Sequence, residues 1–163
     1  MKTEKTASKT MYQAAEFVRR VGIRSKILPK NFPKMENIIF KMLDSKNINF
    51  GGVGGFTPIQ NKMIPFLIIN MAYAPNAFFL MAAIAHEFLH IAQYRKDRNI
   101  NHGNKFRTHC KTFADVLGVD YYLVMGYDAP SKKTAKAKAK ILEKWFNSFR
   151  GREDQKSKMY QEF

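Results

Sequence analysis

Residues 76–94 read NAFFLMAAIAHEFLHIAQY, an apolar run that contains the pattern His-Glu-x-x-His at 86–90. On an α-helix, residues four apart lie about one turn and roughly 6 Å along the axis, so His86 and His90 project from nearly the same face. Glu87 lies ~100° from His86 and ~60° from His90 around that helix, inside the same sector. Two imidazoles can therefore share one metal ion while the carboxylate reaches a water molecule beside it.

The competing interpretation is that these histidines only fill the core. A single histidine on an apolar face usually has its nitrogens satisfied by neighbouring groups. Here two histidines stand at ligand spacing with a carboxylate between them, and burying Glu87 without a partner would be costly. One cation would compensate for all three side chains, so the pattern favours a metal site of the kind found in zinc hydrolases.

The identity of a third ligand can be tested against spacing, because a catalytic zinc ion needs three protein ligands and one open position. A histidine six residues after His90, as in metzincins, would fall on Lys96, which excludes that class. A downstream glutamate, as in thermolysin-type enzymes, has no good candidate because Glu143 lies in a distant basic segment. His102 is favoured, since it precedes a glycine at the start of the next predicted helix. His109, two turns further on, is the competitor.

The two histidine-containing segments together resemble the signature of a known family. Residues 86–90, HEFLH, are followed after a short polar loop by residues 102–106, HGNKF. This order is similar to that of the SprT-like metalloproteases, in which His-Glu-x-x-His precedes His-Gly-x-x-aromatic. The similarity extends over residues 34–117, where a hairpin and an apolar strand come before the motif helix.

The resemblance implies one Zn²⁺ ion held by His86, His90 and His102, with Glu87 as the general base of peptide hydrolysis. It implies an α+β fold, a zincin-like domain of the small gluzincin type. In it, helices pack on a small antiparallel or mixed sheet with the His-Glu-x-x-His helix at the centre. It also implies a protease that acts on DNA-bound or DNA-crosslinked proteins. Many relatives carry a cysteine-rich zinc ribbon, which a chain with the single cysteine Cys110 cannot form.

Length and composition fit one folded domain of an intracellular protein. The 163 residues are 45% hydrophobic and include 14 Phe and 7 Tyr, which argues against global disorder. One cysteine excludes an intramolecular disulfide, so we expect a reducing compartment, and the polar N-terminus predicts no signal peptide. The uncharged run from Met63 to His86 is broken by Pro65 and Pro75, so we predict no membrane span. A monomer is favoured.

The formal net charge of +15 indicates a polyanionic partner, most simply DNA, possibly single-stranded. No Lys or Arg occurs between Met63 and Tyr94, whereas the segment Ser131 to Lys144 carries six lysines. A solvated surface is the alternative, with the aromatics of that segment docking on the core. The candidate DNA contacts are Lys132, Lys133, Lys136, Lys138, Lys140, Lys144 and Trp145. Among them, Trp145 could stack on unpaired bases.

Apolar periodicity and turn residues predict the order of elements. We expect helices at 11–21, at 33–43, from Asn76 through the motif, and from His102 to Gly118. A glycine-rich strand at 48–56, beside which an extended substrate could pair, and a strand at 63–70 flank a turn at 57–62. Residues 119–125 form a strand or a helical turn. The predicted organisation is a flexible basic arm at 1–10, the metalloprotease domain at 11–128, a basic amphipathic helix at 129–150 and a frayed tail at 151–163.

Two other functions are consistent with the sequence. The chain could be a non-catalytic DNA-binding or nucleoprotein component in which His109 or Cys110 completes a closed, structural zinc site. It could also be a peptidase for acidic proteins with no role at nucleic acids. An open coordination position would favour an enzyme over the structural site.

Overall fold

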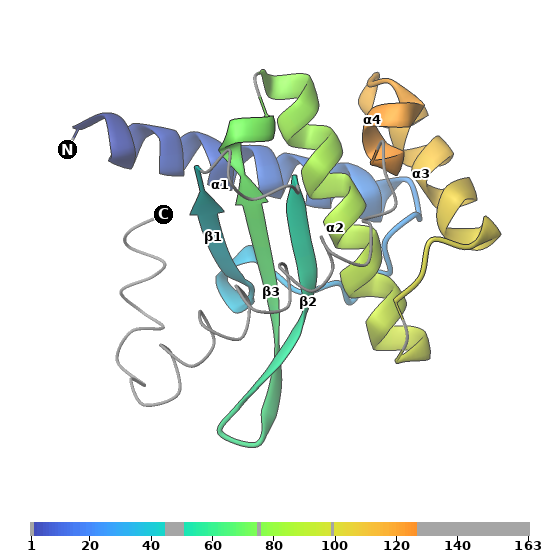
Figure 1. The fold of residues 1–163 in the computed structure, drawn as a ribbon. Helices are drawn as coiled ribbons and strands as arrows, with labels where there is room; N and C mark the ends of the chain where they lie inside the picture. The colour runs from blue at the N-terminus through green and yellow to red at the C-terminus, as the bar shows by residue number, and fades with distance from the viewer. Residues whose placement is uncertain (1, 45–50, 75, 99, 127–163) are drawn as a thin grey trace, which may run out of the picture.

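The fold is a mixed α+β arrangement of helices on a small sheet, as predicted (Figure 1). The computed structural model describes residues 2–44, 51–74, 76–98 and 100–126. Its elements in chain order are α1 (Lys2–Arg24), η1 (Met35–Asn37), β1 (Ile39–Leu43), β2 (Gly52–Ile59), β3 (Lys62–Asn70), η2 (Met71–Tyr73), α2 (Ala77–Asp97), α3 (Asn104–Leu117) and α4 (Tyr121–Met125).

The three strands lie in the order β1-β3-β2, with β1 parallel and β2 antiparallel to β3. β2 and β3 form a hairpin whose turn residues Gln60 and Asn61 both have positive φ, at 49° and 61°. A turn of this kind matches the right-handed twist of the two strands. Among the described strands β2 lies at an edge of the sheet and pairs only with β3.

Successive side chains of β3 point to opposite faces of the sheet, and both faces are buried, which explains why its sequence is continuously apolar. Leu67 and Ile69 face the main core, whereas Phe66 and Ile68 belong to a second cluster on the opposite face. All four are buried, so the strand is covered on both faces, as its composition predicted.

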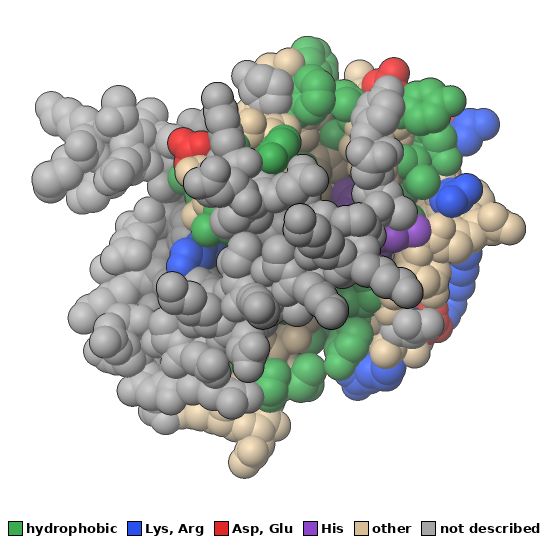
Figure 2. Space-filling view, in the orientation of Figure 1, with side chains coloured by type: hydrophobic (Ala, Val, Ile, Leu, Met, Phe, Trp, Pro, Cys, Tyr) green, Lys and Arg blue, Asp and Glu red, His purple; other side chains and the backbone are tan. Residues whose placement is uncertain are grey.

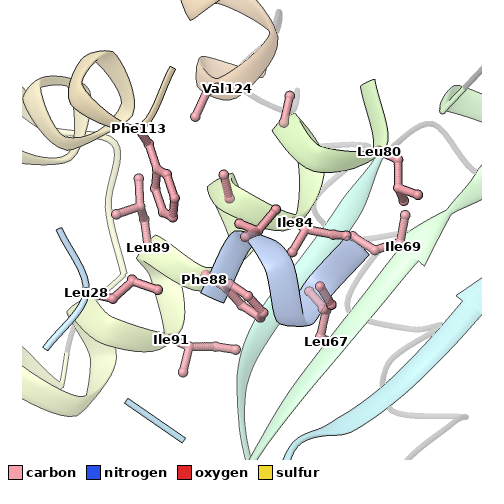
Figure 3. Packing of buried hydrophobic residues seen from close by; sticks show 14 of the residues in the cluster. Leu28, Leu67, Ile69, Leu80, Ile84, Phe88, Leu89, Ile91, Phe113 and Val124 are labelled. Carbon is pink, nitrogen blue, oxygen red and sulfur yellow. The ribbon is translucent and has the colours of Figure 1, made fainter. Parts of the chain in front are cut away.

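The main core lies between α1, α2, α3 and one face of the sheet. α1 (blue in Figure 1) crosses behind the sheet and contacts α2 through its buried side chains Met11, Ala15 and Val18. Figure 3 shows Ile84, Phe88 and Ile91 of α2 directed into this cluster, together with Leu67 and Ile69 of β3 and Phe113 of α3.

α2 is the central helix, because it contacts α1, α3, α4, β2 and β3. It begins where predicted: the side chain of Asn76 accepts hydrogen bonds from the backbone N–H groups of Phe78 and Phe79, at 3.0 and 3.2 Å. It ends at Asp97, after which Arg98 takes a left-handed conformation with φ 53°. The helix is buried on several faces, which fits its nearly uniform apolar composition.

The prediction of a helix at 33–43 is wrong. The chain there forms the short 3-10 helix η1 and then the strand β1, paired in parallel with β3 from Ile39↔Phe66 to Leu43↔Asn70. The positions Met35, Ile38 and Met42 fit helical spacing. However, Ile38, Ile39 and Phe40 are consecutive buried residues, and such a short apolar run suits a strand equally well.

Three further differences concern boundaries. α1 begins at Lys2, so the segment expected as a flexible arm belongs largely to this helix, since no Gly or Pro interrupts residues 2–21. The hairpin turn is restricted to Gln60 and Asn61 instead of 57–62, and β2 extends to Ile59. Residues 119–125 contain the helix α4. The start of the predicted strand at 48–56, as well as the segments 129–150 and 151–163, lies outside the described residues. Among the described residues, no helix is long and apolar enough to cross a membrane.

Replacing Gly54 by alanine should destabilise the fold by about 1–3 kcal/mol, the usual cost of overpacking. A Cβ at this position would lie 2.5 Å from the backbone oxygen of Glu87, and backbone in the middle of α2 cannot move aside. Gly51→Ala is the matched control, because a Cβ there meets nothing within 4 Å. Denaturant unfolding of both variants checks this, and equal stability of the two would contradict the close packing of β2 on α2.

Candidate metal centre

Three histidines converge at the junction of α2 and α3. The Nε2 atom of His90 lies 3.1 Å from Nε2 of His86 and 3.0 Å from Nε2 of His102, and the third distance, between His86 and His102, is 3.2 Å. They are thus close enough to share a metal ion. Figure 2 shows histidine side chains (purple) at the surface of this region.

Hydrogen bonds to the outer ring nitrogens fix two of these imidazoles. Nδ1 of His86 lies 2.6 Å from the backbone oxygen of Val124 on α4. A carbonyl oxygen can only accept, so Nδ1 carries the proton and Nε2 of the neutral ring presents a lone pair to the centre.

The same reasoning applies to His90 through the side-chain amide of Gln93. Nδ1 of His90 lies 3.3 Å from Oε1 of Gln93. The amide is oriented by Asn101, whose backbone N–H donates to Oε1 and whose carbonyl accepts from Nε2 of Gln93, both at 3.1 Å. Oε1 therefore accepts from His90, and Nε2 of His90 also presents a lone pair inward.

His102 is positioned by the loop that these bonds hold. Gln93 anchors Asn101 to α2, and the Asn101 side chain accepts a hydrogen bond of 2.9 Å from the N–H of Gly103. Arg107 on α3 donates to the carbonyl of His102 at 3.2 Å. The loop from α2 to α3 is thereby fixed on both sides of the third imidazole.

Phe106 on α3 forms an apolar wall behind all three rings. Its ring stacks on His90 with the centroids 4.5 Å apart and the planes at 15°. It meets His86 and His102 edge-on, with centroids 5.0 Å away in each case. Because Phe106 is buried, one side of the centre is shielded from water.

Burial of the centre also affects its charge state. The pKa of His90 is lowered to about 4, chiefly because burial disfavours the charged ring; the carboxylate of Glu87 opposes this, and His86 and His102 add to it. His90 is therefore neutral at physiological pH, as a metal-ligating imidazole must be.

Glu87 lies in the same turn of α2 and is only 4% exposed. Its side chain rests against the glycine-rich strand β2: a Cβ built on Gly52 would come within 3.1 Å of both Cγ and Oε1 of Glu87. The two glycines at 52 and 54 thus let α2 approach the strand closely. The glycine-rich composition of this strand, which suits an approaching substrate backbone, therefore also serves the packing of α2 on β2.

The donor set fits a divalent cation. A tetrahedral zinc ion with Zn–N bonds of about 2.0–2.1 Å places its ligand nitrogens roughly 3.3–3.4 Å apart, close to the observed 3.0–3.2 Å. Lone pairs directed at one another at this distance repel, and a cation between them removes the repulsion. The three histidines are therefore compatible with a bound metal ion.

The competing residues do not join this cluster among the described residues. His109 lines a cleft with Lys96 and Lys105 and is not part of the cluster, and Cys110 is buried with Sγ 3.8 Å from the carbonyl oxygen of Val124. Burial raises the pKa of the Cys110 thiol to about 12, so it is a protonated core residue. The predicted DNA contacts at positions 132–145 lie outside the described residues.

Three supporting groups escaped the sequence analysis. Gln93, three residues after His90 on the same helical face, could have been found from its spacing. Asn101, directly before His102, is a common loop residue and gives little signal. Val124 contributes a backbone carbonyl from 38 residues away, which no side-chain pattern can reveal.

Comparison of the chain with protein-family models, with curated proteins and with solved structures finds no match.

Stability of the metal-free protein should fall as the pH drops from about 6.5 to about 4. In this window the unfolded chain binds a proton at His90 that the folded chain excludes, so acid favours unfolding by up to roughly 3 kcal/mol. Urea unfolding of the EDTA-treated protein at several pH values measures this. In His90→Asn, the free energy of unfolding should depend less steeply on pH. An unchanged pH dependence would show that His90 titrates normally in the fold.

Proposed function

We propose that this chain is a zinc-dependent endopeptidase of the SprT-like type, with a zincin-like fold, that cleaves DNA-bound or DNA-crosslinked proteins. The observation that carries the proposal is the convergence of three imidazole nitrogens to within 3.2 Å beside a buried carboxylate. Three neutral nitrogen donors suit zinc, and three protein ligands leave a position for chemistry. The resemblance of residues 86–106 to the family's two motifs supports the same assignment.

His86, His90 and His102 would hold the ion. Zinc bound there supplies Lewis-acid chemistry, activating water near neutral pH and polarising the scissile carbonyl. Glu87 acts as the general base: its carboxylate accepts a proton from the attacking water and later delivers it to the leaving amine nitrogen. Its contact with Gly52 holds the carboxylate in a fixed position, which such a proton transfer requires.

The edge strand β2 offers a place for an extended substrate. Among the described residues β2 pairs with β3 alone, and its glycines Gly52 and Gly54 lie against Glu87, the proposed base. A peptide added to this edge would be held by main-chain hydrogen bonds, which give little sequence preference. Low sequence preference suits an enzyme that removes many different proteins from DNA.

The proposed DNA role is supported by the net charge of +15, which favours association with phosphates. A structural zinc site is less well supported, because neither His109 nor Cys110 joins the histidine cluster among the described residues. Such a closed site would need a fourth protein ligand.

The function is tested with zinc-loaded protein and a basic DNA-binding protein as substrate, with and without single-stranded DNA, over a salt series. We expect cleavage that DNA enhances and that rising salt suppresses, because the association depends on phosphate contacts. An acidic protein of similar size is the control substrate. Cleavage of both substrates without any effect of DNA would leave a peptidase but refute the role at DNA. Absence of cleavage in the zinc-loaded protein under all these conditions would refute the peptidase.

A further inference from the structure

A concave site lies next to the histidine cluster, and its lining includes Gln93 and Phe106, which also contact His90. It is a cleft of about 520 Å³ between the loop after α1, the C-terminal turns of α2 and the first turns of α3. Its volume is within the range of small-molecule sites, which is roughly 300–1,000 Å³. The proposed hydrolysis uses none of its charged side chains.

The walls of the cleft are strongly cationic. Among the described residues, the charged side chains that line it are Lys26, Arg95, Lys96 and Lys105 and one carboxylate, Asp97. Within the described part of the chain, no ion pair neutralises Lys26, Lys96 or Lys105. Figure 2 shows Lys and Arg side chains (blue) along the edge of the molecule formed by α2 and α3 in Figure 1. All four cations are exposed, and an anion in the cleft would meet several of them at once.

Two details indicate that these cations face a common space. The pKa of His109, which also lines the cleft, is lowered first by burial and then by Lys105 and Lys96, so both ammonium groups lie near its ring. Nη1 of Arg95 donates a hydrogen bond of 2.6 Å to the carbonyl of Asn31, which ties the end of α2 to the loop after α1. The cleft is therefore held between fixed elements.

The inner wall is apolar. Leu89 and Phe106 form it, and Ala92 lies beside them. A bare inorganic anion would contact only the cationic rim, whereas an anion carrying an organic body would also cover this wall. The cavity is too small for a folded protein segment or a duplex.

We propose that this cleft binds a phosphate group carried on a small organic body, such as a nucleotide. A phosphate monoester carries about −1.5 to −2 charges at neutral pH and several acceptor oxygens, which suits several ammonium groups and one guanidinium better than a single carboxylate would. The same chemistry could come from a free nucleotide or from the 5′-phosphorylated end of a nucleic-acid strand. The described residues that line the site lie between positions 26 and 109, and the proposal does not depend on the proposed peptidase activity.

The test uses the zinc-loaded full chain and compares AMP with adenosine by titration calorimetry. AMP should bind at least about tenfold more tightly than adenosine, because the charge-assisted contacts are lost with the phosphate. In the double variant Lys96→Glu/Lys105→Glu, AMP affinity should fall about 100-fold. The control Lys62→Glu/Lys111→Glu makes the same charge change at exposed positions outside the cleft, and we expect less than about threefold change.

Equal affinity for AMP and adenosine, no AMP binding at millimolar concentration, or equal loss in both double variants would overturn the proposal. If AMP coordinated zinc directly, its affinity would not change when the cleft lysines are replaced. That result would also contradict the proposal. A 5′-phosphorylated trinucleotide and its 5′-hydroxyl counterpart distinguish the sources. Binding of the phosphorylated strand alone assigns a strand end, and binding of AMP without either strand assigns a free nucleotide. Equal binding of both strands contradicts recognition of the phosphate.

Discussion

Replacing Glu87 by glutamine should reduce peptide hydrolysis about 10²–10⁴-fold, the usual contribution of a general base, while zinc binding is retained. Glutamine has nearly the same size and shape as glutamate but cannot accept the proton from water. Glu87 is 4% exposed, packs on Gly52 and is the only buried carboxylate among the described residues. The neutral amide is also cheaper to bury than a carboxylate, so the fold should be preserved.

The measurement is kcat on a protein substrate with zinc content determined on the same samples. Glu36→Gln is the matched control, since it makes the same chemical change at an exposed glutamate in η1. That variant should retain full activity. Hydrolysis by Glu87→Gln at the wild-type rate, with zinc bound, would remove Glu87 from the mechanism.

Replacing His102 by alanine should weaken zinc binding by more than the ~10–100-fold that loss of a group hydrogen-bonded to a metal ligand costs. Only two imidazoles from α2 would remain, and two ligands seldom retain zinc against water. The loop that carries residue 102 stays anchored through Gln93 and Asn101, so the loss should come from the missing nitrogen and not from unfolding.

His109→Ala is the matched control for this second prediction. It also removes an imidazole, but one that lies on α3 and is not part of the cluster. Zinc affinity, measured by competition with a chelator, should be unchanged in that variant. Zinc retained by His102→Ala but lost by His109→Ala would assign the third ligand to the competitor and contradict the geometry described above.

The elements whose signals are local were predictable from the sequence. The helix that carries His86 and His90 begins at Asn76, because an asparagine before an apolar run is a strong capping signal. α3 ends at Gly118, whose φ of 68° few other residues adopt easily. His102 could be favoured over His109 because it occupies the turn before α3, and the structure brings its Nε2 to the other two.

The structural features that the sequence did not predict depend on contacts with residues far away in the chain. Residues 39–43 became a strand because β3 offers a parallel partner, which no window of sequence contains. The sequence relates the glycines of β2 to substrate pairing but does not predict their packing on α2. That packing is a tertiary contact, the close approach of Glu87 to Gly52 and Gly54. The orientation of His86 depends on the carbonyl of Val124, and carbonyl groups are invisible in a side-chain pattern.

X-ray absorption spectroscopy of the zinc-loaded protein most directly tests whether His86, His90 and His102 together hold one ion. We predict a first shell made only of nitrogen and oxygen at about 2.0–2.1 Å, with the outer-shell scattering of three imidazoles. A thiolate sulfur at about 2.3 Å, for which Cys110 is the sole cysteine of the chain, or a fit with fewer than three imidazoles would contradict this account.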